Sequence, residues 1–581
     1  MRVVSFPLLI ALAILPVRAA APAPSKAEQK AAQGLLRSLK LRDRIAQMVV
    51  GVVYGTAPSR ASKEYEKYRH WVKDLHIGGL IVNNRVQYGL VRNAEPHAMA
   101  LFLNQMQKLA RTPLIVGGDF ERGASMRVAG TTRFPHSMAY AAARDTDASR
   151  REGLMTAREA RALGVHWIFA PVADVNNNPD NPVINIRSYG ESPQDVAAHV
   201  SAYIEGAHSD PKNPVLLSAK HFPGHGDTSI DSHLELARLD ADRDRIETVE
   251  MAPFRAAIAS GVDSIMTAHI TVPALDAAEI PATVSRRVLT GLLREGLGFS
   301  GLVVTDAMDM LGLAKQFSWG EAAVRAIEAG ADVLLMPPDP EAAINAVLAA
   351  VESGRLSRKR IDQSAQRVLE GKVRVGLTKK KLVDLDAVSD ALDLEEDAAQ
   401  AQSVADRAVT LVRNTGNVVP LAAPNEACVV ASSGLRLSSF GQRMNEEFRK
   451  RAPRARLMFV DNTMHGAALE AILGDASHCS VIVFATFTTG TALNGELAPF
   501  VQKLTESLTP VIFISLGNPY LLKDFPKAAA HLAAFSPTTS AEIAVVKALF
   551  GEIAISGRLP VTIPGLAAYG DGIPVARRAA N

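Results

Sequence analysis

The chain has 581 residues, too many for one ordinary domain, so we expect roughly two to four domains. Hydrophobic residues make up 48% and charged residues 21% of the chain, a composition typical of a globular enzyme that excludes disordered and collagen-like proteins. The 63 lysine and arginine residues almost balance the 60 aspartate and glutamate residues. We therefore expect no nucleic-acid partner and no membrane-surface partner held by net charge.

The amino terminus has the pattern of a secretory signal peptide. Arg2 precedes an apolar stretch over residues 3–17, and small residues follow at Ala19, Ala20, Ala21 and Ala23. An apolar stretch of about 15 residues is shorter than the ~20 needed to cross a bilayer. We predict a signal peptide over residues 1–21, export to the periplasm or the medium, and no membrane insertion after cleavage.

Eight short apolar runs follow one another along the first two thirds of the chain. They are almost continuously hydrophobic, as strands buried on both faces of a parallel sheet are. The runs occupy residues 48–53, 78–84, 113–119, 165–175, 215–222, 264–270, 301–308 and 331–338.

The segments between these runs have helical periodicity. For example, Ile344, Val347, Leu348 and Val351 fall on one helical face, and Gly354 is a stop signal. Eight strand–helix units predict a (β/α)8 TIM barrel domain, which we place at residues 30–380. In such barrels the chemistry lies at the carboxyl ends of the strands, so polar residues that end a run are the candidates for a functional site.

A charged segment, which we interpret as a linker over residues 381–405, follows the barrel. A smaller α/β/α sandwich domain is predicted at residues 406–581, with strands near 410–414, 427–433, 456–461, 481–488, 510–519 and 531–537. This domain lacks a Gly-x-Gly-x-x-Gly loop, so no dinucleotide cofactor is indicated. Cys428 and Cys479, the two cysteines of the chain, begin two of these runs. An exported protein permits a disulfide between them, and two buried thiols are the alternative.

The loop after the fifth run carries the densest polar cluster. It contains three histidines, two aspartates and a lysine within 14 residues: Lys220, His221, His225, Asp227, Asp231 and His233. A polar surface loop would be the simplest interpretation of a single histidine, but this density at a strand end favours a functional site. A metal site is the other alternative; the spacing matches no standard zinc or iron pattern and no second cluster offers ligands, so we predict no metal and no cofactor.

Further polar residues follow other runs. Asp306 comes directly after a buried apolar stretch, and Asp309 is better placed than Asp306 to cap the next helix. Asp119, Arg127 and Arg187 follow the third and fourth runs. Carboxylates that accept from hydroxyl groups, beside lysine and arginine that donate, suit a polyhydroxylated ligand.

These segments resemble glycoside hydrolase family 3, and specifically its β-N-acetylglucosaminidase branch. KHFPGHGDTSIDSH is close to the signature of that branch, VVTDAMDM resembles its nucleophile segment, and IMTAHITVPALD and ADVLLMP also match. GRLPVTIP is similar to part of the family's second domain. The resemblance implies that Asp306 is the nucleophile and that His233 with Asp231 is the acid/base pair. It also implies a substrate-binding set: Asp119, Arg127, Arg187, Lys220, His221 and His225.

One segment departs from the family pattern. The family often has Asp-Gln-Glu-Gly-Gly-Arg where this chain has Asp119-Phe-Glu-Arg-Gly-Ala. Asp119 and Arg127 keep their places, so binding of the terminal sugar is expected to be intact. The departure predicts a different surface beneath the leaving group.

The implied reaction is a retaining hydrolysis of terminal β-linked N-acetylglucosamine (GlcNAc), from peptidoglycan fragments or from chitooligosaccharides. A histidine acid/base can change charge near neutral pH and would not repel phosphate, so a phosphorylase is the nearest alternative. Export argues against it, because a released sugar phosphate would be lost to the cell. A β-glucosidase of the same family would carry its acid/base carboxylate in the second domain, and a non-catalytic cell-wall-binding protein would lack Asp306 or His233.

Overall fold

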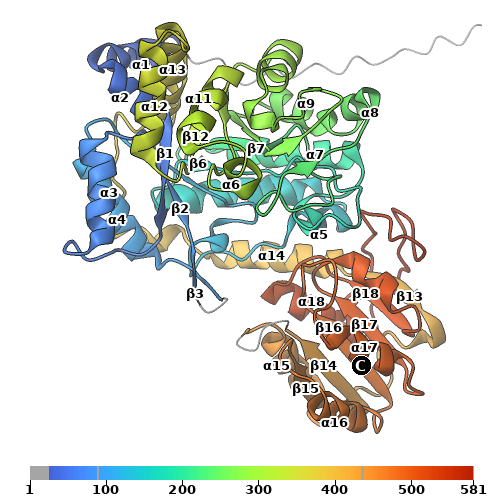
Figure 1. The fold of residues 1–581 in the computed structure, drawn as a ribbon. Coiled ribbons are helices and arrows are strands. Elements are labelled where there is room, and N and C mark those ends of the chain that lie inside the picture. The colour runs from blue at the N-terminus through green and yellow to red at the C-terminus, as the bar shows by residue number, and fades with distance from the viewer. Residues whose placement is uncertain (1–24, 88–89, 434–437, 580–581) are drawn as a thin grey trace, which may run out of the picture.

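The computed structural model describes residues 25–87, 90–433 and 438–579. The predicted signal peptide therefore lies outside the described residues. Figure 1 shows a large barrel domain beside a smaller α/β domain, with helix α14 (Glu395–Ala408) running between them. The predicted fold, a (β/α)8 barrel followed by a smaller α/β sandwich, is confirmed. Within the described part of the chain, no helix combines the length and the apolar character that a membrane span requires.

The barrel is an eight-stranded parallel sheet with the strand order β11-β9-β7-β6-β5-β2-β1-β12. A parallel bridge between Val304 and Val333 completes the ring, and the N–H of Thr305 donates to the carbonyl of Val333 at 3.0 Å. Each of the eight predicted runs overlaps one of its strands: β1 (Val49–Tyr54), β2 (Gly79–Asn83), β5 (Ile115–Gly118), β6 (Trp167–Ile168), β7 (Leu216–Phe222), β9 (Ser264–Thr267), β11 (Leu302–Val304) and β12 (Leu334–Leu335).

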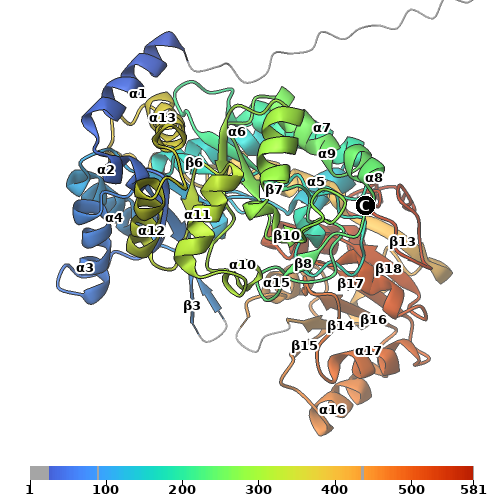
Figure 2. The ribbon, with the colours of Figure 1, turned by 45° about the horizontal axis from the view of Figure 1, so that its top comes forward.

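Helices surround the barrel, as Figure 2 shows from a second direction. They are α1 (Lys26–Ser38), α2 (Leu41–Ala46), α3 (Lys63–Arg69), α4 (Pro96–Leu109), α5 (Ser137–Ala142), α6 (Thr146–Ala162), α7 (Pro193–Ala207), α8 (Arg243–Thr248), α9 (Met251–Ala259), α10 (Leu311–Ala314), α11 (Trp319–Ala329), α12 (Pro340–Glu352) and α13 (Arg358–Arg374). Two π-helical segments, His70–Asp74 and Arg287–Gly296, lie among them. Two small ribbons lie outside the barrel sheet: β3 (Arg85–Gln87) with β4 (Leu90–Arg92), and β8 (Ala237–Arg238) with β10 (Ile270–Thr271).

Helix α12 illustrates how the sequence determines an element. Asp339 caps its amino terminus by accepting from the N–H of Ala342, and Pro340 occupies the first helical position, where its missing N–H costs nothing. Ile344, Val347 and Val351 are buried, as the periodicity predicts. Gly354 follows the helix with φ +81°, a conformation that favours glycine.

The interior of the barrel is packed with side chains. Val50, Ile81, Trp167, Leu216 and Val304 belong to one buried apolar cluster that fills it. Burying each such side chain stabilises the fold by about 1.5–3 kcal/mol. Because the centre is solid, a ligand can bind only at the mouth of the barrel.

The second domain is a six-stranded sheet with helices packed on it. Its strands lie in the order β13-β18-β17-β16-β14-β15, and only β13 is antiparallel to its neighbour. The strands are β13 (Thr410–Asn414), β14 (Ala427–Ser432), β15 (Arg456–Val460), β16 (Val481–Thr486), β17 (Val511–Ser515) and β18 (Ala530–Ala533), and the helices are α15 (Gln442–Arg451), α16 (Ala467–Ala476), α17 (Leu497–Thr505) and α18 (Thr539–Phe550). Cys428 and Cys479 form a disulfide, with their Cα atoms 5.7 Å apart, so the alternative of two free thiols is wrong.

The second domain packs against loops at the mouth of the barrel. His136 Nδ1 lies 2.9 Å from Ser536 Oγ, and Asn176 donates to the hydroxyl of Tyr520 at 3.1 Å. Glu191 accepts from the N–H and the hydroxyl of Thr562, both at 2.6 Å. These contacts support the loops that follow β5 and β6, which also contribute to the site described next.

Candidate active site

A cavity of about 490 Å³ opens at the carboxyl ends of the barrel strands. Among the described residues, those that line it all belong to the barrel domain, between Ile81 and Met336. The barrel brings together residues that lie far apart in sequence because parallel strands all end at this one rim. Eight of the nine predicted site residues line the cavity: Asp119, Arg127, Arg187, Lys220, His221, His225, His233 and Asp306. The ninth, Asp231, contacts one of them.

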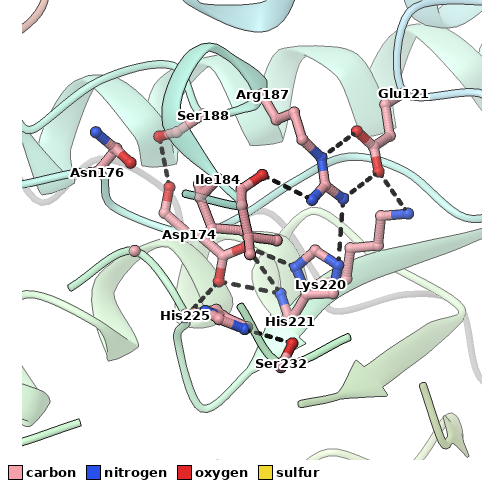
Figure 3. Close-up of polar contacts among 12 residues, drawn as sticks. Glu121, Asp174, Asn176, Ile184, Arg187, Ser188, Lys220, His221, His225 and Ser232 are labelled. Atoms are coloured by element: carbon pink, nitrogen blue, oxygen red, sulfur yellow. Dashed lines mark hydrogen bonds and ion pairs between the residues drawn. The ribbon is translucent and has the colours of Figure 1, made fainter. Parts of the chain in front are cut away.

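A network of charged side chains forms one wall of the cavity (Figure 3). Lys220, near the carboxyl end of β7, donates to Asp119 at 2.9 Å and lies 2.7 Å from Glu121. Arg187 donates two hydrogen bonds to Glu121, at 2.9 and 2.6 Å. Arg127 donates to the other oxygen of Asp119 at 2.8 Å. Three cations therefore share two carboxylates.

This network keeps its members ionised. Burial alone would raise the pKa of Asp119, but the charges of Lys220 and Arg127 outweigh burial and hold that pKa well below its usual range. Glu121 behaves in the same way, because Arg187 and Lys220 overcome its burial and hold its pKa well below the ordinary value. Burial would lower the pKa of Lys220, but Asp119 and Glu121 raise it. At neutral pH the wall is a fixed array of charged donors and acceptors, which suits the hydroxyl groups of a sugar.

A buried carboxylate organises the loop after β7. Asp174 is completely buried; it lies 2.7 Å from Nδ1 of His221, and it accepts from the N–H groups of His221 and His225. Burial would raise the pKa of Asp174, but His221 and His225 lower it, so Asp174 is a carboxylate. The hydrogen bond at Nδ1 fixes the orientation of the His221 ring, whose Nε2 lies 3.4 Å from Arg187.

Asp306 lies in the loop that leaves β11, at the rim of the cavity. Its carboxylate accepts from the N–H of Ala307 at 2.8 Å, and His269 bonds the carbonyl of Ala307 at 3.0 Å. Burial would raise the pKa of Asp306. The charges of His221, His269 and Lys220 and the hydrogen bond from the N–H of Ala307 outweigh burial and lower this pKa. Asp306 is thus held as a carboxylate, the form that a nucleophile needs.

His233 and Asp231 form a pair on the loop over the cavity. Nδ1 of His233 lies 2.7 Å from Asp231 Oδ1, which also accepts from the N–H of His233 at 2.8 Å. The carbonyl of His233 accepts from the N–H of Leu311 at 3.2 Å, so the loop is tied to the start of α10. The His233 side chain is 58% exposed, which leaves its Nε2 open to a ligand or water. The pair has the geometry of an imidazole oriented by a carboxylate, as an acid/base group requires.

His225 differs from the other predicted ligand-binding residues in its surroundings. It is buried, with Nε2 2.7 Å from Ser232 Oγ and Nδ1 2.7 Å from Thr228 Oγ1. Burial lowers the pKa of His225 to about 4, so the ring is neutral at neutral pH. Because both of its ring nitrogens bond residues of the same loop, His225 holds in place the loop that carries His233. The predicted contact between His225 and the substrate stays a prediction.

The expectation that Asp309 caps the next helix is wrong. The residue before α10 is Met310, and no side chain in the described part of the chain caps that helix. Asp309 is exposed and lines the cavity. Helix α10 has only four residues, and its first N–H groups bond backbone carbonyls of the loop around His233, at Ser232 and His233. The backbone of that loop thus takes the place of a side-chain cap.

Comparison with known proteins identifies the family. A family model described as the glycosyl hydrolase family 3 N-terminal domain matches residues 40–370, and the C-terminal domain model of the same family matches residues 395–575. The chain belongs to glycoside hydrolase family 3. It is therefore a glycoside hydrolase, as the resemblance implied.

Several family 3 relatives are similar over nearly their whole length. A β-N-acetylglucosaminidase/β-glucosidase of Cellulomonas fimi is 28% identical, covering 89% of this chain and 93% of the relative. Beta-hexosaminidase A of Pseudoalteromonas piscicida is 29% identical over 84% of this chain and 89% of its own. The structure of a family 3 β-N-acetylglucosaminidase from Paenibacillus has a TM-score of 0.82 and 32% identity, covering 90% of this chain and 99% of that one.

Sequence reasoning missed several residues of this family 3 site. Glu121 and Asp174 anchor the charged network and the His221 loop, and His269 holds the Asp306 loop, yet none of the three was predicted. Glu121 follows the run at 113–119, whereas Asp174 and His269 are the last polar residues of the runs at 165–175 and 264–270. The rule that polar residues at strand ends form the site would have found all three. Arg122, which also lines the cavity, lies in the segment that departs from the family pattern.

Proposed function

We propose that the protein is an exported, retaining exo-β-N-acetylglucosaminidase that removes terminal β-linked GlcNAc from peptidoglycan fragments or chitooligosaccharides. The observation that carries this proposal is that one cavity is lined by the ionised Asp306, by His233 with its partner Asp231 behind it, and by the charged wall around Lys220. Two of the relatives are named as a β-N-acetylglucosaminidase/β-glucosidase and a β-hexosaminidase, which supports an N-acetylated terminal sugar as the substrate. A pocket closed below by the packed barrel suits a terminal sugar better than the middle of a chain.

The proposed reaction has two displacements. Asp306 attacks the anomeric carbon while the imidazolium of His233 gives a proton to the departing oxygen, so the glycosidic bond breaks and a covalent glycosyl ester forms. His233, now neutral, then takes a proton from water, whose oxygen attacks the same carbon and releases Asp306. Asp231 stabilises the charged ring in each half of the cycle. Configuration at the anomeric carbon is retained.

Export is supported by two independent features. The residues before the described part of the chain have the signal-peptide pattern. The disulfide between Cys428 and Cys479 favours an oxidising compartment, because cytosolic proteins rarely keep one.

Replacement of Asp306 tests the nucleophile. We expect Asp306→Ala to abolish hydrolysis of an aryl N-acetyl-β-glucosaminide, a loss of at least about 10⁴-fold in kcat, because the covalent intermediate can no longer form. Asp309→Asn is the matched control, since it removes an exposed carboxylate from the same loop and is expected to keep most of the activity. Turnover by Asp306→Ala within about tenfold of the unsubstituted enzyme would remove Asp306 from this role.

Replacement of His233 tests the acid. His233→Ala should slow chitobiose, whose sugar leaving group needs a proton, far more than a dinitrophenyl glycoside, whose leaving group departs unaided. An equal loss on both substrates would contradict the acid role.

A phosphorylase remains the competing function, because an imidazole acid/base does not repel an incoming phosphate. A β-glucoside phosphorylase structure has the same fold, with a TM-score of 0.80, but its 22% identity carries the fold alone. Product analysis with and without inorganic phosphate separates the two functions. Free GlcNAc in both conditions is expected, and GlcNAc 1-phosphate as the main product would favour the phosphorylase.

A further inference from the structure

A second cavity, of about 330 Å³, lies at the opposite end of the barrel from the active site. It is lined by Arg161 in the last turn of α6, by His166 directly before β6 and by Lys212 in the loop that enters β7. Lys380 and Lys381, in the segment that leaves α13, also line it. These residues precede the amino ends of the strands, whereas the active site lies at the carboxyl ends, and the two cavities have no described lining residue in common.

The segment that carries the two lysines is fastened to the barrel. The side chain of Asn104, on α4, donates to the carbonyl of Val383 at 2.9 Å and accepts from its N–H at 3.0 Å. Val383 itself lines the cavity. The folded chain therefore forms this cavity without a ligand, as is usual for sites that bind small molecules.

Arg161 is a cation without a partner. Among the described residues its guanidinium has no ion pair and no hydrogen bond, and its Nη1 is buried, while the side chain as a whole lines the cavity. Burial lowers the pKa of Arg161 to about 10, so the group is still charged at neutral pH. An unpaired, partly buried cation costs free energy that a bound anion would recover.

His166 adds a hydrogen-bond donor. Its side chain is buried, and its Nδ1 accepts from the N–H of Val116 at 3.3 Å. Burial and the charge of Arg161 lower the pKa of His166 well below its ordinary value, so the ring is neutral at neutral pH. A neutral ring whose Nδ1 accepts carries its proton on Nε2, and this Nε2 has no partner in the described part of the chain. The ring thus offers an N–H group to a ligand in the cavity.

The lysines complete a set of donors. The side chains of Lys212, Lys380 and Lys381 form no ion pair and no hydrogen bond within the described residues. Arg158, which also lines the cavity, is already paired with acidic residues of α14. Asp384 is the one carboxylate among the described lining residues, and it is exposed. Positive charge is therefore in excess around the cavity.

We infer that this cavity binds a phosphate group, either free phosphate or the phosphate of a small ester. Arginine and imidazole N–H groups donate to oxygen atoms in fixed directions, and the lysines supply further charge for an anion that carries nearly two negative charges at neutral pH. The cavity is roughly ten times as large as the ~30 Å³ that one water occupies, so it also has room for the organic part of an ester. The inference is independent of the proposed function, because none of these residues belongs to the active site.

A bound phosphate would join two parts of the barrel domain. Arg161 and His166 lie on either side of the turn between α6 and β6, whereas Lys380 and Lys381 belong to the segment that leads from α13 toward α14. An anion that contacts both groups holds this segment against the barrel in the folded protein and has no such site in the unfolded chain. Binding should therefore stabilise the fold.

The test is a calorimetric titration of the full protein with inorganic phosphate, and separately with glycerol 3-phosphate, at constant ionic strength. We expect saturable binding to one site, and Arg161→Gln should weaken it at least about tenfold, the range of a charge-assisted hydrogen bond. Phosphate at about 100 times its Kd should raise the thermal midpoint by about 5 °C in the unsubstituted protein and by less in Arg161→Gln. Tighter binding of the ester would identify an organic phosphate as the ligand, and equal binding would identify free phosphate.

Two other variants keep the test decisive. The double variant Lys380→Gln/Lys381→Gln should also weaken binding, and it decides the matter if Arg161→Gln fails to fold. Lys379→Gln is the matched control, because Lys379 is exposed, adjoins the same lysines and is not among the described lining residues. It should change the Kd by no more than about twofold. An equal loss in Lys379→Gln would show diffuse attraction to positive charge and would overturn the inference.

The active-site cavity is the competing place for phosphate. Arg122→Gln removes a cation from that cavity and should leave the Kd for phosphate unchanged. If phosphate instead inhibits hydrolysis of an aryl N-acetyl-β-glucosaminide competitively, and Arg122→Gln but not Arg161→Gln weakens its binding, the phosphate site is at the mouth of the barrel and the inference is wrong. The absence of saturable binding of both phosphate and glycerol 3-phosphate would overturn it as well, whether or not the protein hydrolyses the glycoside.

Discussion

Glu121 is the residue whose replacement should disturb the site most without removing a reacting group. Its side chain is 6% exposed and pairs with Arg187 and Lys220. Glu121→Gln would leave Arg127, Arg187 and Lys220 with Asp119 as their only carboxylate partner in this network. Breaking a buried ion pair costs about 3–5 kcal/mol, and the lower end applies because a quarter of the Arg187 side chain is exposed. At about 2 °C per kcal/mol for a large domain, the barrel should unfold about 6 °C lower.

Two assays check this prediction. Thermal unfolding measures stability, and kcat/KM on an aryl N-acetyl-β-glucosaminide should fall about 100-fold, because Lys220 and Arg187 lose their fixed positions. Glu321→Gln is the control, since Glu321 also pairs with two arginines, Arg325 and Arg355, but on the surface. Its loss should cost less than about 1 kcal/mol. If both variants unfolded at the same temperature with undiminished activity, the buried network would not hold the site.

Two more predictions concern stability. The disulfide closes a loop with a sequence separation of 51 residues, so the double variant Cys428→Ala/Cys479→Ala should destabilise the second domain by about 4 kcal/mol in urea unfolding. Reduction should lower the urea midpoint of the unsubstituted protein but not that of the double variant. Because the pKa values of Asp119, Glu121 and Asp174 are lowered by folding, the stability they contribute is complete above about pH 4 and is lost progressively as the pH falls below it. Thermal unfolding from pH 7 to pH 3 should show this loss, and Glu121→Gln should show a smaller one.

The architecture was predictable because hydrophobic pattern alone determines it. Every barrel strand lies in a run that is apolar on both faces, and such runs have few alternatives to a buried parallel sheet. Strand length was less predictable. The run at 165–175 yields only the two residues of β6. Beyond β6 the backbone keeps only isolated pairing with β7, such as the bridge between Val172 and Lys220, in the segment that carries Asp174.

The candidate site was predictable only in part, since hydrogen-bond partners depend on contacts between distant segments. His221 and Asp174 are 47 residues apart, and Lys220 and Asp119 are 101 apart, so their pairing follows from barrel closure and not from local spacing. The His233–Asp231 contact was the exception, because two residues of one loop need no tertiary structure to meet. Asp309 was misassigned because cap propensity is local, whereas the backbone of the His233 loop occupies that end of α10.

Burial separates the groups whose charge must stay fixed from the group whose charge must change. Glu121 and Lys220 are buried and Asp119 is mostly buried, and each is ionised there because it has partners of opposite charge. An acid/base residue in that wall would be locked into one protonation state by the same partners. His233 is instead mostly exposed, on a loop whose backbone is tied to the start of α10. There it can exchange a proton with solvent between the two displacements, and Asp231 at 2.7 Å stabilises its charged form without burying it.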